Sequence, residues 1–208
     1  MPERTITCFC EHVMEAPVPE TIDLTTQPEV LDQIIEGEFL SFTCEKCGKK
    51  MKPEFQVALY DTGKNIDILL IPELERATFL TGKNSYNANR VVIGYTELSE
   101  KAIILKHNLD DRVVEIIKYL LLEKSNNPDK TSITFAGMEH GTEQPDKQKK
   151  LLFHVHGLHE NEVGVTRIPM DLYDKIEKDL PKRMEEEPFK EITTPPYVSI
   201  NNITMEVD

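Results

Sequence analysis

The sequence predicts an α+β protein, in which a small N-terminal β unit with one short helix precedes a mixed α+β domain. Three observations predict this class. Short strand-like segments surround a single helical pattern before residue 73, two helical patterns follow each other directly between residues 97 and 124, and three strand-like segments come after them. At 208 residues the chain suits one large domain or two small ones, and a hydrophobic fraction of 39% permits a core.

The N-terminal unit begins with two strand-like segments, residues 5–8 and residues 16–25. The next pattern, over residues 26–37, predicts a short amphipathic helix with Pro28 near its first position and Gly37 as its stop. Together these segments describe a strand-rich unit with a single helix.

A second set of strands completes this unit. Residues 38–43 alternate polar and apolar side chains and lead into a cysteine pair. Residues 54–61 and 65–73 flank the turn signal Asp-Thr-Gly-Lys-Asn, which predicts a β-hairpin. The polar, Asn-rich residues 74–89 are typical of a linker or a long loop. We therefore expect an N-terminal domain at 1–80 and a C-terminal domain at 88–208.

The C-terminal part opens with a strand-like segment at 90–96 and a helical pattern at 97–107. The strongest helical pattern of the chain follows at 109–124 and has one apolar stripe, formed by Val113, Ile116, Ile117, Leu120 and Leu121. That spacing is typical of a helix that packs on a core. Further expected elements are three strands and a short helix, at residues 131–138, 149–158, 162–169 and 169–180.

Cysteine usage carries the clearest chemical signal. The chain contains four cysteines in two close pairs, Cys8 with Cys10 and Cys44 with Cys47. Four thiolates around one ion are the usual ligand set of a structural zinc site, and two local pairs brought together by a fold commonly supply them. Gly48 allows a tight turn after the second pair. We therefore expect all four cysteines to bind one zinc ion, with His12 as a possible substitute ligand.

Other uses of the cysteines stay open at this point. A thioredoxin-like redox pair requires its first cysteine at a helix N-terminus, whereas the lysines after Gly48 open no apolar helical pattern. Iron can occupy a four-thiolate site, and buried thiols without a metal would leave two close pairs unexplained. Among zinc, a redox pair, iron and buried thiols without a metal, zinc is the favoured interpretation.

These residues resemble the CpXC protein family of bacteria and archaea, whose name describes two cysteine motifs around a short ribbon. The resemblance runs from Ile-Thr-Cys-Phe-Cys at 6–10 through residues 22–51 and 59–73, and it resumes over residues 98–124. Glu45 stands where the family name expects proline, and the first motif is one residue shorter and lacks proline. The resemblance implies a zinc-ribbon-like N-terminal unit in a functionally uncharacterised family, and it supplies no catalytic residues.

A histidine cluster offers a competing function. His154, His156, His159 and Glu160 lie close together in the sequence, and strand alternation places His154 and His156 on one face. The cluster is similar to the His-x-His-x-Asp-His motif of metallo-β-lactamase-like hydrolases, but Leu158 occupies the aspartate position. A metal-dependent hydrolase is therefore the alternative function, whereas a solvent-facing histidine pair is the simpler interpretation. We find no catalytic residues and favour a protein that is not an enzyme.

Charge limits the partners. With 24 basic and 37 acidic residues the formal net charge is −13, which repels a phosphate backbone. The local exception, Lys46, Lys49, Lys50 and Lys52, could contact a phosphate or an acidic partner, so a nucleic-acid-associated zinc ribbon is a further alternative. Neither a signal peptide nor a membrane-length apolar run is present, so we expect a cytoplasmic protein. A protein partner or a homo-oligomer is expected, without nucleic acid or membrane.

Overall fold

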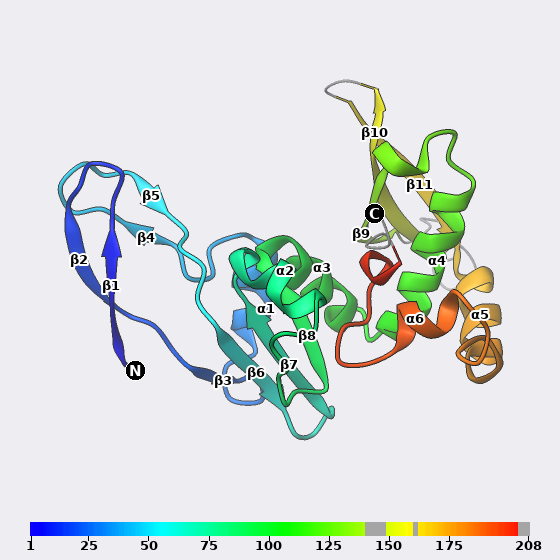
Figure 1. Cartoon of the computed structure of the whole chain (residues 1–208), viewed down its shortest axis with the longest axis horizontal. Coiled ribbons are helices and arrows are strands. Elements are labelled where there is room, and N and C mark those ends of the chain that lie inside the picture. The colour runs from blue at the N-terminus through cyan, green and yellow to red at the C-terminus, as the bar shows by residue number, and fades with distance from the viewer. Residues whose placement is uncertain (140–148, 160–161, 204–208) are drawn as a thin grey trace. The chain divides into compact units, whose positions relative to one another are not determined.

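The computed structural model describes residues 1–139, 149–159 and 162–203, and it has the predicted α+β class (Figure 1). The chain divides into two compact units, Met1–Ala102 and Ile103–Asp208. Among the described residues, every helix is too short or too polar to cross a bilayer. The expected domain limits, 1–80 and 88–208, stay a prediction.

The first unit combines two hairpins with a four-stranded sheet. The hairpins are β1 (Glu3–Thr7) with β2 (Val13–Pro17), and β4 (Phe42–Thr43) with β5 (Lys50–Met51), both antiparallel. The remaining elements are β3 (Thr21–Asp23), α1 (Glu29–Ile35), β6 (Val57–Asp61), β7 (Ile66–Ile71), η1 (Glu73–Glu75), α2 (Arg76–Leu80), β8 (Arg90–Ile93) and α3 (Gly94–Lys106). We call the two hairpins together the ribbon. In Figure 1 its four strands, in blue and cyan, lie beside one another.

The four-stranded sheet has the order β3-β6-β7-β8. Strands β6 and β7 form the predicted antiparallel hairpin, and its turn closes through a hydrogen bond from the Lys64 N–H to Asp61 Oδ1 at 3.1 Å. Strand β3 pairs with β6 in parallel, and β7 pairs with β8 in parallel. Parallel neighbours need a crossover connection, and α1 and α2 lie in those two connections. Apolar side chains such as Val57, Leu70 and Ile93 are fully buried in this sheet.

The two hairpins of the ribbon come from separate parts of the sequence. The β1–β2 hairpin precedes β3, whereas the β4–β5 hairpin interrupts the connection from α1 to β6. After β5 the chain is held to α3, because the Tyr95 hydroxyl donates a hydrogen bond of 2.7 Å to the Pro53 carbonyl. Lys52 Nζ lies 4.2 Å from the centre of the same tyrosine ring, a cation–π contact. The second hairpin is therefore fastened to the sheet side of the unit at its exit.

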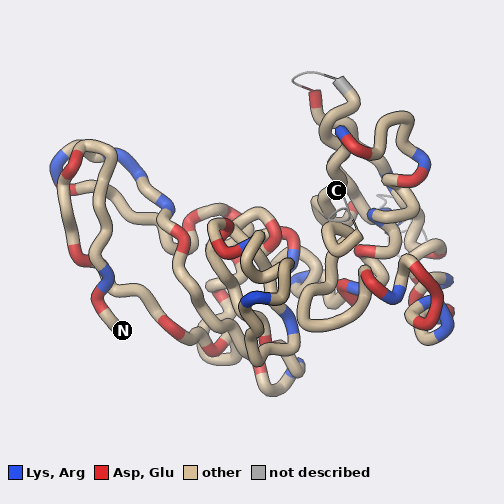
Figure 2. Tube along the Cα trace, in the orientation of Figure 1, with Lys and Arg blue, Asp and Glu red and all other residues tan. Residues whose placement is uncertain are grey.

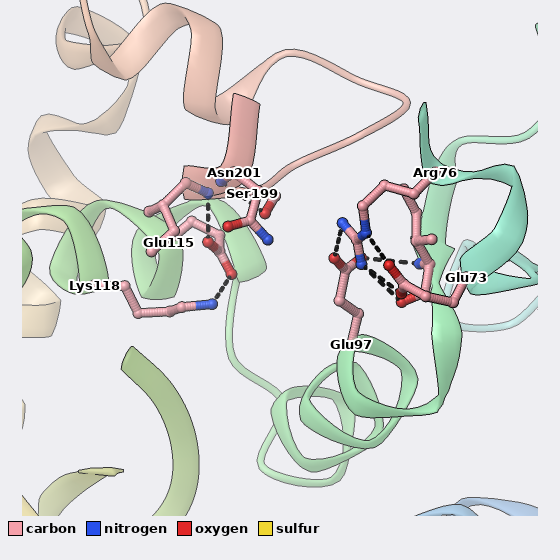
Figure 3. Close-up of polar contacts among 9 residues, drawn as sticks. Glu73, Arg76, Glu97, Glu115, Lys118, Ser199 and Asn201 are labelled. Atoms are coloured by element: carbon pink, nitrogen blue, oxygen red, sulfur yellow. Dashed lines mark hydrogen bonds and ion pairs between the residues drawn. The ribbon is translucent and has the colours of Figure 1, made fainter. Parts of the chain in front are cut away.

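A guanidinium group joins the helices around β8. Arg76, the first residue of α2, donates to Glu73 Oε2 and forms an ion pair of 2.9 Å with Glu97 Oε1 on α3 (Figure 3). The other oxygen of Glu97 accepts the Ile93 N–H at 2.9 Å, so this carboxylate also satisfies a backbone donor at the start of α3. The segment expected as a linker, 74–89, thus contains most of η1 and all of α2, and β8 joins the sheet through β7.

The second unit packs helices on a three-stranded antiparallel sheet. Its elements are α4 (Asp111–Glu123), η2 (Pro128–Lys130), β9 (Ser132–Glu139), β10 (Lys150–His159), β11 (Glu162–Pro169), α5 (Met170–Arg183), α6 (Phe189–Thr193) and η3 (Ile200–Asn202). The sheet order is β11-β10-β9. Buried side chains from the sheet and helices α4 and α5, among them Phe135, Phe153, Ile117 and Ile176, form one core. The predicted stripe of α4 therefore packs inward, as expected of an amphipathic helix.

Helix α4 also buries an ion pair that its pattern did not predict. Glu115 and Lys118 are 4% and 5% exposed, and Lys118 Nζ donates to Glu115 Oε1 at 2.8 Å. The second carboxylate oxygen accepts the Ile200 N–H at 2.8 Å (Figure 3). The pair therefore binds η3, near the end of the described chain, to α4.

Candidate metal centre

The two cysteine turns of the ribbon share one plan. In each hairpin the first cysteine follows directly after a strand, and its N–H bonds across the hairpin: Cys8 to the His12 carbonyl at 2.8 Å, and Cys44 to the Lys49 carbonyl at 2.9 Å. The second cysteine lies inside the turn. Each turn thus presents one cysteine from its strand end and one from its loop.

A residue with left-handed backbone follows each second cysteine. Glu11 has a φ of 65° and Gly48 a φ of 71°. The Glu11 N–H donates to the Cys8 carbonyl, and the Gly48 N–H donates to the Cys44 carbonyl, both at 2.8 Å. The first loop has three residues, 9–11, and the second has four, 45–48; hairpin loops of both lengths are common, and both loops here end in the left-handed residue. Glycine adopts this conformation freely, whereas glutamate is strained in it.

The fold brings the four predicted sulfur ligands together. One ligand atom from each of Cys8, Cys10, Cys44 and Cys47 lies within 4.8 Å of the other three, and the group could hold a metal ion. Cys8 Sγ lies 3.6 Å from Cys47 Sγ, and Cys10 Sγ lies 3.7 Å from Cys44 Sγ. Each of these close contacts joins one hairpin to the other. All four cysteines are free thiols.

These distances match a tetrahedral thiolate site. With Zn–S bonds of about 2.3 Å, the sulfur atoms around a tetrahedral zinc ion stand about 3.8 Å apart. The observed contacts of 3.6 and 3.7 Å are close to that edge length. The donor set and its spacing therefore fit a closed four-coordinate metal centre. Iron in a four-thiolate site has similar requirements, so the spacing does not choose between the two metals.

The sulfurs sit at different depths. Cys8 and Cys44 are buried and belong to a small apolar cluster with Ile6, Ala16 and Met51. Cys10 is half-buried and Cys47 is exposed. The ribbon therefore has a modest core of its own, in which two of the four potential ligands are core residues.

Backbone donors favour a thiolate at one of the four positions. Burial would raise the pKa of Cys44, but the N–H groups of Cys47 and Lys46 and the sulfurs of Cys8 and Cys47 lower that pKa to about 6. For Cys8, the Cys10 N–H lowers the pKa, but burial and the three neighbouring sulfurs together raise it to about 12. The backbone donors therefore favour the thiolate at Cys44, whereas burial and the neighbouring sulfurs favour the protonated thiol at Cys8.

The side chains of the other predicted groups are not members of this cluster. The His12 carbonyl accepts the Cys8 N–H, and the His12 ring is not a member of the four-sulfur group. Lys50 pairs with Glu38 at 3.0 Å, and Lys52 contacts Tyr95, so two of the four lysines contact neighbouring side chains. Figure 2 shows acidic positions near the lysines at the closed end of the β4–β5 hairpin.

The histidine cluster is described in part. His154 and His156 lie on one face of β10 as predicted, with ring centres 6.3 Å apart and nearly perpendicular planes. Glu160 and the side chain of His159 lie outside the described residues. Within the described part of the chain, the cysteine group is the one set of three or more potential ligands that comes together.

Two sequence features of this centre escaped prediction. The left-handed backbone at Glu11 has no glycine to mark it, and its position becomes visible only from the hairpin register, in which Thr7 faces Val13. The aromatic side chain between the first two cysteines, Phe9, is 91% exposed at the tip of its turn.

Comparison with known proteins places most of this architecture in one family. The family model described as "CpXC protein" matches residues 6–118 of the 208 residues. A relative from Treponema pallidum (strain Nichols), titled "Uncharacterized protein", is 28% identical over 215 residues, which cover 94% of this chain and 96% of the relative. No solved structure matches.

Proposed function

The chain belongs to the CpXC protein family, and from this premise we propose that its ribbon binds one structural zinc ion through Cys8, Cys10, Cys44 and Cys47. The observation that carries the proposal is the convergence of four sulfurs within 4.8 Å. Zinc suits the site because it accepts four thiolates in tetrahedral geometry and needs no open coordination position for a structural role.

The structural role of the ion follows from the small size of the ribbon core. Few apolar side chains are buried there, and two of them are cysteines. Metal ligation can supply folding free energy that such a core lacks. The ion would join hairpins that are far apart in the sequence, since Cys8 and Cys47 are separated by 39 positions.

We further propose a non-enzymatic role in protein interaction, with a protein partner or a second copy of the chain. Two exposed apolar features support this role. Phe9 protrudes at the tip of the first cysteine turn, and Val163 and Val165 are about half exposed on β11, an edge strand of its sheet. The net charge of −13 disfavours nucleic acid. A reducing compartment such as the cytoplasm belongs to the proposal, because the site needs free thiols.

Metal analysis of protein purified under reducing conditions tests the zinc site. We expect about one zinc per chain, because four thiolates saturate one ion. Cys44→Ser should remove most of that zinc, whereas His12→Ala and His156→Ala should leave it unchanged. A chain that binds no stoichiometric metal contradicts the proposal, and iron in place of zinc contradicts its choice of ion. Loss of a second metal with His156→Ala would instead favour the hydrolase.

Light scattering in solution tests the interaction role. A mass of twice 23.9 kDa or more supports self-association. Val165→Glu should then return the chain to a monomer if β11 forms the contact. A monomeric mass leaves a separate protein partner, which wild-type protein should capture and Phe9→Ser should bind more weakly. Salt-sensitive binding of DNA or RNA that Lys49→Glu weakens would contradict this role.

A further inference from the structure

The contacts between the four sulfurs of the ribbon also suit the formation of disulfide bonds. Each of the two close contacts, Cys8 with Cys47 at 3.6 Å and Cys10 with Cys44 at 3.7 Å, links one hairpin to the other. We propose that peroxide oxidation of this cluster forms two disulfides, Cys8–Cys47 and Cys10–Cys44, which replace the metal ion and keep the two hairpins joined. This inference rests on the proposed metal site.

Exposure determines which sulfur reacts first. Cys47 is exposed, whereas Cys8 and Cys44 are buried and Cys10 is half-buried. Oxidants react most readily with accessible thiolates. Cys47 is therefore the position at which hydrogen peroxide enters the cluster.

The first bond forms in two balanced steps. The Cys47 sulfur attacks one oxygen of hydrogen peroxide, so that an S–O bond forms, the O–O bond breaks, and the departing hydroxide takes up a proton to give water. The Cys8 sulfur then attacks Cys47 Sγ. An S–S bond forms, the S–O bond breaks, and the leaving hydroxide takes up a proton to give a second water. That proton comes from the Cys8 thiol in metal-free protein and from solvent in zinc-loaded protein. Two sulfurs lose two electrons, and one peroxide is reduced.

Cys8 is the proposed resolving thiol, because its sulfur contacts Cys47 Sγ across the two hairpins. Cys44 Sγ also contacts Cys47 Sγ, so disulfide mapping decides between these two thiols. A disulfide is about 2.05 Å long, so the two sulfurs must approach by about 1.5 Å from their present contact of 3.6 Å. The same reaction with a second peroxide joins Cys10 to Cys44, whose sulfurs start 3.7 Å apart. With all four sulfurs oxidised, the thiolate ligands are consumed and the ion is released.

The covalent state differs in its consequence from simple loss of metal. The two new bonds connect positions on either side of α1, since the paired cysteines are 39 and 34 positions apart. The hairpins therefore remain fastened after the ion has left. A bond within one turn, such as Cys44–Cys47, would instead leave the two hairpins unconnected.

Disulfide mapping tests the pairing, because the chain offers a cleavage site inside each turn. Zinc-loaded protein and chelator-treated, metal-free protein are exposed to hydrogen peroxide, and remaining thiols are alkylated in denaturant. Chymotrypsin then cleaves after Phe9 and trypsin after Lys46, so that mass spectrometry assigns each cysteine separately. We expect Cys8 linked to Cys47 and Cys10 linked to Cys44 in both samples, with zinc released from the loaded one.

Two variants sharpen the result. Cys10→Ser should still form the Cys8–Cys47 bond, whereas Cys47→Ser should lose that bond and react more slowly with peroxide. Bonds within one turn, bonds between chains as the main product, or an unreactive cluster would overturn the inference. Zinc content of untreated protein tests the metal site by itself, so a failure of the pairing in metal-free protein is distinguishable from a failure of the proposed function.

Discussion

The left-handed glycine after the second cysteine pair leads to a quantitative prediction for metal affinity. A Cβ on Gly48 would meet nothing within 4 Å, so Gly48→Ala changes only the backbone energy at a φ of +71°. An L-residue in this region costs about 1–2 kcal/mol. Reduced freedom of the unfolded chain offsets about 0.4–1 kcal/mol of that cost. The net destabilisation of the turn is therefore about 1 kcal/mol.

This cost should appear in zinc binding, because the turn holds two of the proposed ligands. Its N–H to carbonyl bond, from Gly48 to Cys44, is part of the geometry that the ion requires. When binding and folding of the ribbon are coupled, about 1 kcal/mol weakens zinc affinity about fivefold. Competition with a chromogenic chelator under reducing conditions measures this change.

Two variants serve as controls for the glycine. Gly82 also has a left-handed φ, +69°, and open space around it, but it lies outside both cysteine turns. Gly82→Ala should lower stability by a similar amount and leave zinc affinity within about twofold. Glu11→Gly relieves the strain of the first turn and should strengthen zinc binding. Equal losses of affinity in the two alanine variants, or no loss at position 48, would refute the reasoning.

Three further predictions concern stability and can be measured by denaturant unfolding. Lys118→Ala should cost about 3–5 kcal/mol, because it removes a buried cation from beside the buried Glu115 carboxylate. Lys182→Ala, which breaks an exposed pair with Glu186, should change stability by less than about 0.5 kcal/mol. Similar effects of the two would contradict the burial argument. Tyr95→Phe loses the hydrogen bond to Pro53 and should cost about 1 kcal/mol at pH 7. Burial and the Glu54 charge raise the pKa of Tyr95. The wild type should therefore lose stability above the unfolded-state tyrosine pKa of about 10, and its stability advantage over Tyr95→Phe should shrink there. A stability difference that stays constant up to about pH 11 would argue against this linkage. Phe9→Ser should leave stability within about 0.5 kcal/mol because the ring is 91% exposed, and a large loss would show that the ring is buried in solution.

The candidate metal centre could be predicted from the sequence because its signal is chemical and local. Four cysteines in two close pairs leave few arrangements that use all of them, and Gly48 marks the turn of the second pair. The first turn was harder. Glu11 adopts a left-handed conformation that residue identity does not reveal, since the hairpin register imposes it.

Long-range pairing explains what the sequence could not reveal about the fold. The hairpin of β6 and β7 was predictable from a turn signal between two apolar runs. The parallel pairing of β3 with β6 joins segments separated by a helix and the second hairpin, and no local pattern encodes it. Likewise, Glu115 looks like a solvent-facing residue of α4, but the backbone N–H it accepts belongs to Ile200, 85 positions later.

The separation of the two cysteine turns imposes an order on synthesis of the protein. Cys10 is translated 34 positions ahead of Cys44, which corresponds to roughly 2–7 s at elongation rates of about 5–20 residues per second. During that interval the nascent chain carries two thiols whose partners have not yet been translated. The two halves of the ribbon can therefore join only after the β4–β5 hairpin has been synthesised.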